Sequence, residues 1–292
     1  MSKDGNVHFI KNGSETQLAL SYFPSQTPSP ATGTKGHRGP IILSHGTFSN
    51  HRSMRGLSQH LSDIGYECWV LDFQGHGYSD KPTIAPNFEQ MCIEDAAASI
   101  NFLKKRYPLE KLIWIGHSGG GLAALMLLAR KPEYAATLKA IVTVASQTTK
   151  AATSSRNRLI IRLSRLVTRM LGLAPGKFFK LGPENEFGPV MAQWYEWSLT
   201  GNWLAEDEFD YLNALPANTT PTLMLSGSGD MFIAPPEGCR ALFDKIGSAN
   251  KKYTECGLST GFLENYSHSR IISSRNAAKE IWPLISAWLA KL

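Results

Sequence analysis

One short stretch of the sequence combines a nucleophile with the small residues that could hold it exposed. The apolar run Leu112–Ile115 is followed by the pentapeptide GHSGG at 116–120, and an Ala- and Leu-rich segment of helical character comes next. A G-x-S-x-G pentapeptide arises by chance in roughly one chain in ten of this length. It indicates chemistry where it joins a buried strand to a helix, and this sequence provides that context.

A serine in such a turn can be a nucleophile rather than part of a simple tight turn. Side chains at Gly116 and Gly120 are expected to collide with neighbouring elements, so the glycines let the backbone bend sharply and expose Ser118. The serine also precedes a helix, whose free N–H groups and dipole favour developing negative charge. Ser118 is therefore the candidate nucleophile.

A serine hydroxyl needs a base, and the base needs an orienting carboxylate. With this type of elbow both follow the serine in the chain. His268 is the only histidine after Ser118, and Asp230 ends an apolar segment where a loop carboxylate can reach it. The less well placed alternatives for the acid are Asp207, Asp210 and Asp244. The contrasting interpretation is that Asp230 only caps a turn and His268 is a surface residue.

The oxyanion hole is expected to use two backbone N–H groups. One belongs to Gly119, after the nucleophile, and the other to the loop "LSHGTFSN", where Thr47 is the expected donor and Phe48 the alternative. His45 in this loop is interpreted as a structural hydrogen-bonding residue. The residues expected to contact substrate are Phe48, His117, Trp194 and Trp197.

Strands and helices alternate along most of the chain, which indicates an α/β fold with a mostly parallel sheet covered on both faces. An N-terminal hairpin is expected at 5–13 and 16–24. Further strands are expected at 41–46, 66–73, 111–116, 138–146, 222–230 and 251–258, and helices at 53–65, 89–107, 121–133, 238–247 and 279–292. The alternation stops near Thr148, so residues 1–147 and 216–292 are predicted to form the core and 148–215 an inserted cap.

Taken together, these motifs resemble the α/β-hydrolase superfamily, in the branch around serine aminopeptidases and monoacylglycerol lipases. The residues that carry the resemblance are "SHG", "DFQGHGYSD", "GHSGG", Asp230 and His268, in that order. The resemblance implies a helical cap over the core, with Ser118, Asp230 and His268 as nucleophile, acid and base. It says little about substrate, because this superfamily hosts many chemistries.

The expected function is hydrolysis of an acyl ester or thioester through an acyl-enzyme, with an apolar acyl group. C–C bond hydrolysis and acyl transfer use the same triad and stay open. A non-catalytic ligand-binding relative is the alternative from another class, although an intact triad argues against it.

Composition excludes several other classes. The 292 residues carry a net charge of +6 without a nucleic-acid motif. No cofactor fingerprint or metal-ligand spacing is present, and Cys68, Cys92, Cys239 and Cys256 are scattered as expected for reduced core thiols. The first residues lack a signal-peptide pattern and no apolar run is long enough to span a membrane, so a cytoplasmic protein is expected.

Two features of the predicted cap bear on what it binds. Its aromatic residues can form a small core or line an acyl pocket: Phe178, Phe179, Phe187, Trp194, Tyr195, Trp197 and Trp203. Residues 158–171 predict an amphipathic helix, lying on an apolar surface and covering the site entrance, with arginines on one side: Arg158, Arg162, Arg165 and Arg169. This stripe is either a solvated face or a contact for an anionic partner. The partner could be a lipid surface, an acidic carrier protein, or a charged head group on the substrate. The substrate itself is expected to be a small-molecule or carrier-borne acyl compound.

Overall fold

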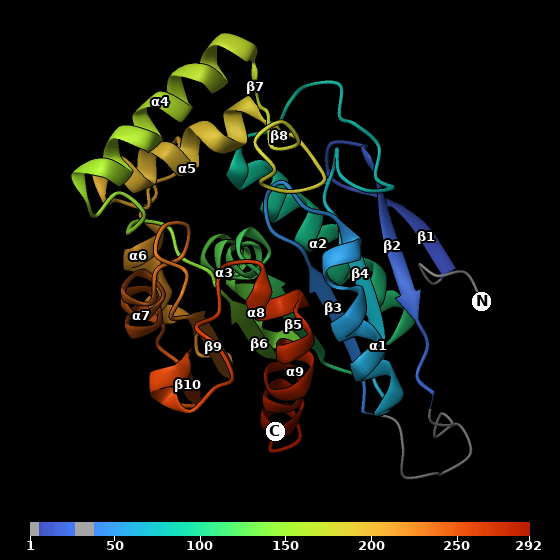
Figure 1. Cartoon of the computed structure of the whole chain (residues 1–292). Helices are drawn as coiled ribbons and strands as arrows, with labels where there is room; N and C mark the ends of the chain where they lie inside the picture. Colours follow the sequence, from blue (N-terminus) through green and yellow to red (C-terminus); the bar gives the residue numbers. More distant parts are fainter. Residues whose placement is uncertain (1–5, 27–37) are drawn as a thin grey trace.

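The computed structural model describes residues 6–26 and 38–292 (Figure 1). The N-terminal residues on which the expectation of no leader peptide depends lie partly outside these ranges. Within them, no helix combines the length and apolar character that a membrane span requires.

An eight-stranded sheet forms the centre of the molecule. Its strands, in chain order, are β1 (Asn6–Lys11), β2 (Gln17–Phe23), β3 (Pro40–Ser44), β4 (Glu67–Asp72), β5 (Leu112–His117), β6 (Leu138–Val144), β9 (Thr222–Gly227) and β10 (Lys251–Cys256). Their spatial order is β1-β2-β4-β3-β5-β6-β9-β10. The strands from β4 to β10 in this order are parallel, and β2 joins β1 and β4 antiparallel. The expected hairpin and parallel sheet are both confirmed.

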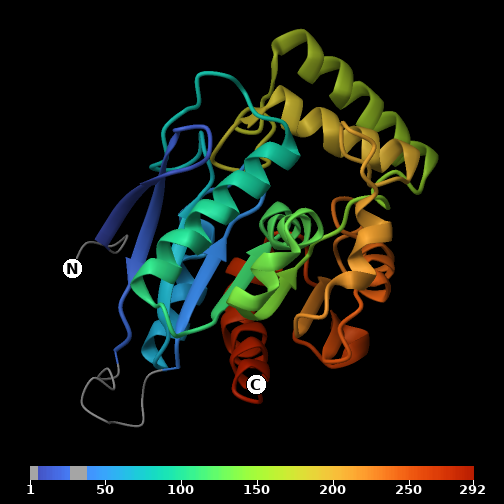
Figure 2. The same cartoon turned by 180° about the vertical axis from the view of Figure 1, so that it is seen from behind.

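Helices cover both faces of the sheet, as the continuous apolar strands require. On one face α1 (Arg55–Asp63) packs against α9 (Arg275–Leu289), and on the other α2 (Phe88–Arg106) packs against α3 (Gly119–Arg130), as opposite views show (Figures 1 and 2). The central strands β3 and β5 are buried along their whole length. Strand β5 therefore ends at a rigid position, directly before Ser118.

Most of the chain between β6 and β9 lies beyond one end of the sheet, whereas its last helix lies beside α3 (Figure 1). This part of the chain contains α4 (Ser155–Leu171), β7 (Leu173–Ala174), β8 (Glu186–Phe187), α5 (Gly188–Thr200) and α6 (Tyr211–Ala214). Helices α4 and α5 pack against each other, and a small apolar cluster that includes Ile161, Met191 and Tyr195 lies between them. We keep the name cap for residues 148–215, whose exact bounds stay a prediction.

The aromatic residues of the cap divide between three environments. Trp197 and Trp203 are buried in the main core of the molecule, whereas Phe178 and Phe179 are exposed. Trp194 and Tyr195 face the cavity described below. The small core of the cap therefore includes Tyr195 but neither Trp197 nor Trp203, and an acyl pocket lined by Trp194 and Tyr195 stays a prediction.

The cysteines bear out their expected role as unpaired core thiols. Cys68, Cys92, Cys239 and Cys256 are all free and buried.

Candidate active site

Ser118 lies at the turn between β5 and α3 in a strained backbone conformation. Its φ of 53° and ψ of −121° are unusual for a residue with a side chain. The Ser118 N–H donates to Val144 O at 2.8 Å, and the Ser118 carbonyl accepts a 2.8 Å hydrogen bond from Ser146 Oγ. These bonds to β6 and to the residues after it hold the serine in its exposed turn. No sequence pattern indicates the contribution of Ser146.

Close packing explains the glycines around the nucleophile. A Cβ at Gly116 would lie 2.2 Å from Gly120 C, and a Cβ at Gly120 would lie 2.5 Å from Ser44 O. Both collisions were expected from the sequence and are confirmed. A Cβ at Gly46 would lie 2.7 Å from Ser118 Cβ, so the "SHG" loop also needs its glycine to pass beside the nucleophile.

Asp230 and His268 form a hydrogen-bonded pair, with 2.5 Å between Asp230 Oδ2 and His268 Nδ1. The other carboxylate oxygen of Asp230 accepts from the N–H groups of Ile233 and Ala234, both at 3.1 Å. Burial alone would raise the pKa of Asp230, but the hydrogen bond and charge of His268 outweigh it and lower that pKa. Asp230 is therefore ionised at neutral pH and fixes the tautomer of His268, leaving Nε2 free to accept a proton.

His117 holds the loop that carries His268. Its Nε2 donates to the His268 carbonyl oxygen at 2.8 Å, and the two rings lie 4.8 Å apart between centroids. Burial, together with the nearby His268 ring, lowers the pKa of His117 to about 3. The imidazole is thus neutral at pH 7. It acts on the position of the base, and it does not line the cavity above Ser118.

The two candidate donors of the oxyanion hole differ in what they contact. The Thr47 amide nitrogen lies 3.7 Å from the point where a Cβ on Gly119 would stand, so the two N–H-bearing residues are adjacent. Within the described ranges, the Thr47 N–H has no hydrogen-bond partner. The Phe48 N–H instead donates to Glu186 Oε2 at 3.4 Å. This occupation favours Thr47 over Phe48 as the second donor.

Glu186 comes from the cap strand β8 and is fully buried against the core. Its Oε2 also accepts a 3.1 Å hydrogen bond from His76 Nε2, and its Oε1 accepts from the Phe187 N–H at 2.9 Å. Burial would lower the pKa of His76, but the charge and hydrogen bond of Glu186 reverse this and raise it to about 9. The pair is therefore an ion pair at neutral pH. It connects the cap, the "DFQGHGYSD" loop and the residue after Thr47.

His45 has the structural role expected for it. Its Nε2 accepts from the Phe73 N–H at 3.2 Å and its Nδ1 donates to Gly46 O at 2.8 Å. Burial lowers the pKa of His45 to about 4, and the ring therefore stays neutral. A neutral imidazole in this tautomer braces the "SHG" loop against the end of β4.

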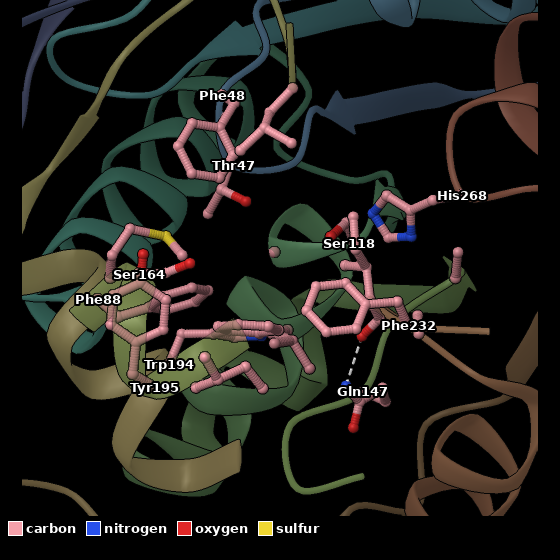
Figure 3. A pocket seen from close by; sticks show the side chains of 18 residues that line it. Thr47, Phe48, Phe88, Ser118, Gln147, Ser164, Trp194, Tyr195, Phe232 and His268 are labelled. Atoms are coloured by element: carbon pink, nitrogen blue, oxygen red, sulfur yellow. Dashed lines mark hydrogen bonds between the residues drawn. The ribbon is translucent and has the colours of Figure 1, made fainter. Parts of the chain in front are cut away.

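Above Ser118 lies a cavity of about 140 Å³ between the core and the cap (Figure 3). Most of its lining is apolar, and Figure 3 shows the His268 imidazole beside Ser118 at one side of it. The lining side chains used below are Phe48, Phe88, Ile161, Ser164, Trp194, Tyr195 and Phe232. Gln147 is also at the wall, but its Nε2 donates to Ile233 O and its Oε1 accepts from the Lys150 N–H. The cavity thus presents few unpaired polar groups to a ligand apart from those of Ser118 and His268.

The residues expected to contact substrate separate into two groups. Phe48 and Trp194 line the cavity. His117 and Trp197 do not, because His117 lies beneath the His268 loop and Trp197 is buried against Phe88, 5.2 Å away between ring centroids. Trp197 follows Trp194 by three residues on α5, an offset of only about 60° around the helix. The packing of α5 against the core therefore separates the two rings.

Comparison with known proteins agrees with this architecture. A family model described as "alpha/beta hydrolase fold" matches residues 39–182. A probable alcohol acetyltransferase of Saccharomyces cerevisiae is 33% identical over 129 residues, which cover 44% of this chain and 37% of the yeast protein. The chain likewise spans less than half of the length of other curated relatives, which include lipases from Homo sapiens, Drosophila melanogaster and Rattus norvegicus.

Solved structures match over the whole chain at lower identity. A soluble variant of monoglyceride lipase from Saccharomyces cerevisiae superposes with a TM-score of 0.71 at 17% identity, covering 100% of this chain and 96% of that one. A thermophilic esterase from Thermogutta terrifontis superposes with a TM-score of 0.68 at 19% identity, covering 98% and 99%. These likenesses concern the fold. With the matching family model, the sheet order and the elbow at Ser118, they show that the chain has the α/β-hydrolase fold.

Proposed function

We propose that this protein is a serine hydrolase that cleaves acyl esters or thioesters with an apolar acyl group. The observation that carries the proposal is the position of Ser118 and the His268–Asp230 pair at the wall of one mostly apolar cavity. Lipases and esterases among the relatives and solved structures support the reaction class.

The proposed mechanism assigns one role to each group. Ser118 Oγ attacks the acyl carbonyl carbon while His268 Nε2 takes the hydroxyl proton. Asp230 stabilises the imidazolium that forms, through the bond to Nδ1. The N–H groups of Gly119 and Thr47 donate to the oxyanion. His268 then protonates the leaving group, and water activated by the same imidazole releases the acid from the acyl-enzyme.

Acyl transfer to an alcohol is a second candidate. The similarity to a probable alcohol acetyltransferase favours it, and the chemistry differs only in whether water or an alcohol attacks the acyl-enzyme. Adding ethanol or a longer alcohol during turnover of a p-nitrophenyl ester distinguishes the two. A transferase forms the new ester as its main product, whereas a hydrolase forms mainly the free acid.

The proposal is tested by turnover and active-site labelling. Ser118→Ala should lower kcat on p-nitrophenyl butyrate by about 10⁵-fold or more. It should also abolish labelling by a fluorophosphonate, with circular dichroism unchanged. Asp230→Asn should cost about 10⁴-fold because the histidine tautomer is no longer fixed. A fluorophosphonate adduct on another serine, or wild-type rates in either variant, would contradict the assignment.

A further inference from the structure

Helix α4 of the cap has three distinct faces. The inner face carries Ile161, Ser164 and Thr168: Ile161 and Ser164 line the cavity, and Thr168 Oγ1 lies 3.1 Å from Tyr195 Oη on α5. At about 100° per residue, a row of apolar residues lies nearly opposite to this inner face. The row consists of Leu159, Leu163, Leu166 and Met170. The arginine stripe lies between the two.

The apolar row is directed away from the protein. Each of its four side chains is more than half exposed, and Met170 reaches 76%. The expectation that this side of the helix lies on an apolar surface of the protein is therefore wrong. The helix instead contacts the rest of the cap through its narrower inner face. The segment after α4 adds further exposed apolar side chains, namely Leu171, Leu173, Phe178, Phe179 and Leu181.

The segment that carries these side chains is strongly basic. Between residues 151 and 183 the sequence has no acidic residue and seven basic ones: Arg156, Arg158, Arg162, Arg165, Arg169, Lys177 and Lys180. Two of them contact acids elsewhere in the cap, Arg165 with Glu196 at 2.8 Å and Lys177 with Glu184 at 3.4 Å. The surface formed by these basic residues and the exposed apolar ones is called the outer cap face below.

We propose that the outer cap face docks onto an anionic lipid surface. Apolar side chains beside arginines are the arrangement with which an amphipathic helix enters the boundary between lipid head groups and acyl chains. Basic residues there are attracted to acidic head groups. A second copy of the chain fits less well, because two such basic faces would repel each other.

An apolar groove beside α4 shares part of its lining with the catalytic cavity. It has a volume of about 260 Å³ and lies between α4 and residues 174–181. Phe48, Ser164, Leu181 and Tyr195 line both the groove and the cavity above Ser118. Insofar as the proposed function holds, an acyl ester held in the lipid could reach Ser118 along this groove without crossing water. The docking itself depends only on the outer cap face.

Vesicle sedimentation with the full-length protein tests the docking. We expect the protein to sediment with vesicles of phosphatidylcholine and phosphatidylglycerol, and far more weakly with phosphatidylcholine alone. Added salt should weaken the binding because it screens the attraction between arginines and head groups. Failure to bind the anionic vesicles at low salt would overturn the proposal.

Two sets of variants separate the apolar and the electrostatic contributions. Replacing Arg158, Arg162 and Arg169 with glutamine should weaken binding by about 100-fold, since each basic residue near an anionic surface contributes about fivefold. Replacing Leu159, Leu166 and Met170 with serine should weaken it by at least about tenfold. None of these six residues lines the catalytic cavity or the groove.

Matched controls carry the same changes elsewhere on the surface. Vesicle binding should be unchanged in two control variants. One replaces Lys245, Lys252 and Lys279 with glutamine, and the other replaces Leu109, Leu258 and Leu263 with serine. Turnover of a water-soluble ester reports that every variant is folded. If the wild-type protein has no esterase activity, that result counts against the proposed function and not against docking. Equal loss of binding in the controls would contradict a specific docking face. So would a concentration-dependent dimer that the leucine and methionine changes dissociate, because a second copy would then be the occupant.

Discussion

At the scale of single residues, the imidazole of His117 has a different task from the one its position suggests. As the residue before the nucleophile it was expected to contact substrate, yet its Nε2 donates to the His268 carbonyl. The interaction joins residues 151 positions apart, and no local pattern reveals it. Ser118 and His268 were predictable as the candidate nucleophile and base because the elbow motif and the chain order restrict them to one choice each.

This task gives a prediction for position 117. His117→Phe keeps a ring but removes the donor, so the buried His268 carbonyl is left unpaired at a cost of about 1–3 kcal/mol. We expect kcat on a soluble ester to fall by about tenfold or more, with KM changed little, because the base is displaced and the cavity is not. Steady-state kinetics measure both parameters.

The matched control is His117→Gln, whose amide can still donate to the same carbonyl. It should recover most of the lost kcat. Equal activity in the phenylalanine variant and the wild type would show that the hydrogen bond does not position His268.

At the scale of elements, the order of strands and helices was predictable but the attachment of the cap was not. Apolar strands of five to seven residues and amphipathic helices give local signals, and α1, α2, α3, α7 (Pro236–Lys245) and α9 begin and end within a few residues of their expected bounds. The ion pair of Glu186 and His76 joins residues 110 positions apart, and neither lies in a pattern that indicates burial. Long-range polar contacts of this kind depend on the finished fold.

The Glu186–His76 pair gives a prediction for pH dependence. The pKa of His76 is raised to about 9 in the folded protein from 6.5, so the pair stabilises the fold fully below about pH 6.5 and loses this contribution as pH rises through 9. The pKa of Glu186 is lowered, so its contribution is present above 4.5 and lost in acid. Tm measured from pH 6 to 10 should therefore fall more steeply in the wild type than in Glu186→Gln, which lacks the charge that raises the His76 pKa.

Substitutions of Glu186 also report on the loop that carries Thr47. Because the Phe48 N–H donates to Glu186, removal of the side chain in Glu186→Ala should displace Thr47 and lower kcat more than it raises KM. Glu186→Gln retains an acceptor and should keep more of the activity. Parallel pH curves for Tm, together with wild-type kcat in the alanine variant, would count against any role of the pair in docking the cap.

At the scale of the whole molecule, the core and the cap both line the cavity, but their contributions are not equally predictable from the sequence. The core contributes the candidate triad, for which chain order is informative. The cap contributes Trp194, Tyr195 and Ile161, whose orientation depends on how two helices pack. The sequence left open whether the cap aromatics form a core or a pocket. Only the rotation of α5, which turns Trp194 to the cavity and Trp197 to the core, separates the two roles.

The depth of this cavity gives a prediction for substrate length. Because its walls are apolar and continue into the groove under α4, kcat/KM on p-nitrophenyl esters should rise from acetate to octanoate by at least about tenfold, since each buried CH₂ contributes up to about 0.8 kcal/mol. Ser164 stands where the cavity and the groove meet. Ser164→Phe should therefore narrow the passage and lower kcat/KM for octanoate while that for acetate is retained.

Ser155→Phe places the same ring at the exposed first turn of α4 and serves as the matched control. It should leave the whole chain-length profile unchanged, because residue 155 lines neither the cavity nor the groove. A profile in the wild type that is flat or falls with chain length would mean that the acyl chain does not lie along the cap. A Ser164→Phe variant that loses acetate and octanoate activity equally, with its Tm unchanged, would place the acyl chain elsewhere in the cavity.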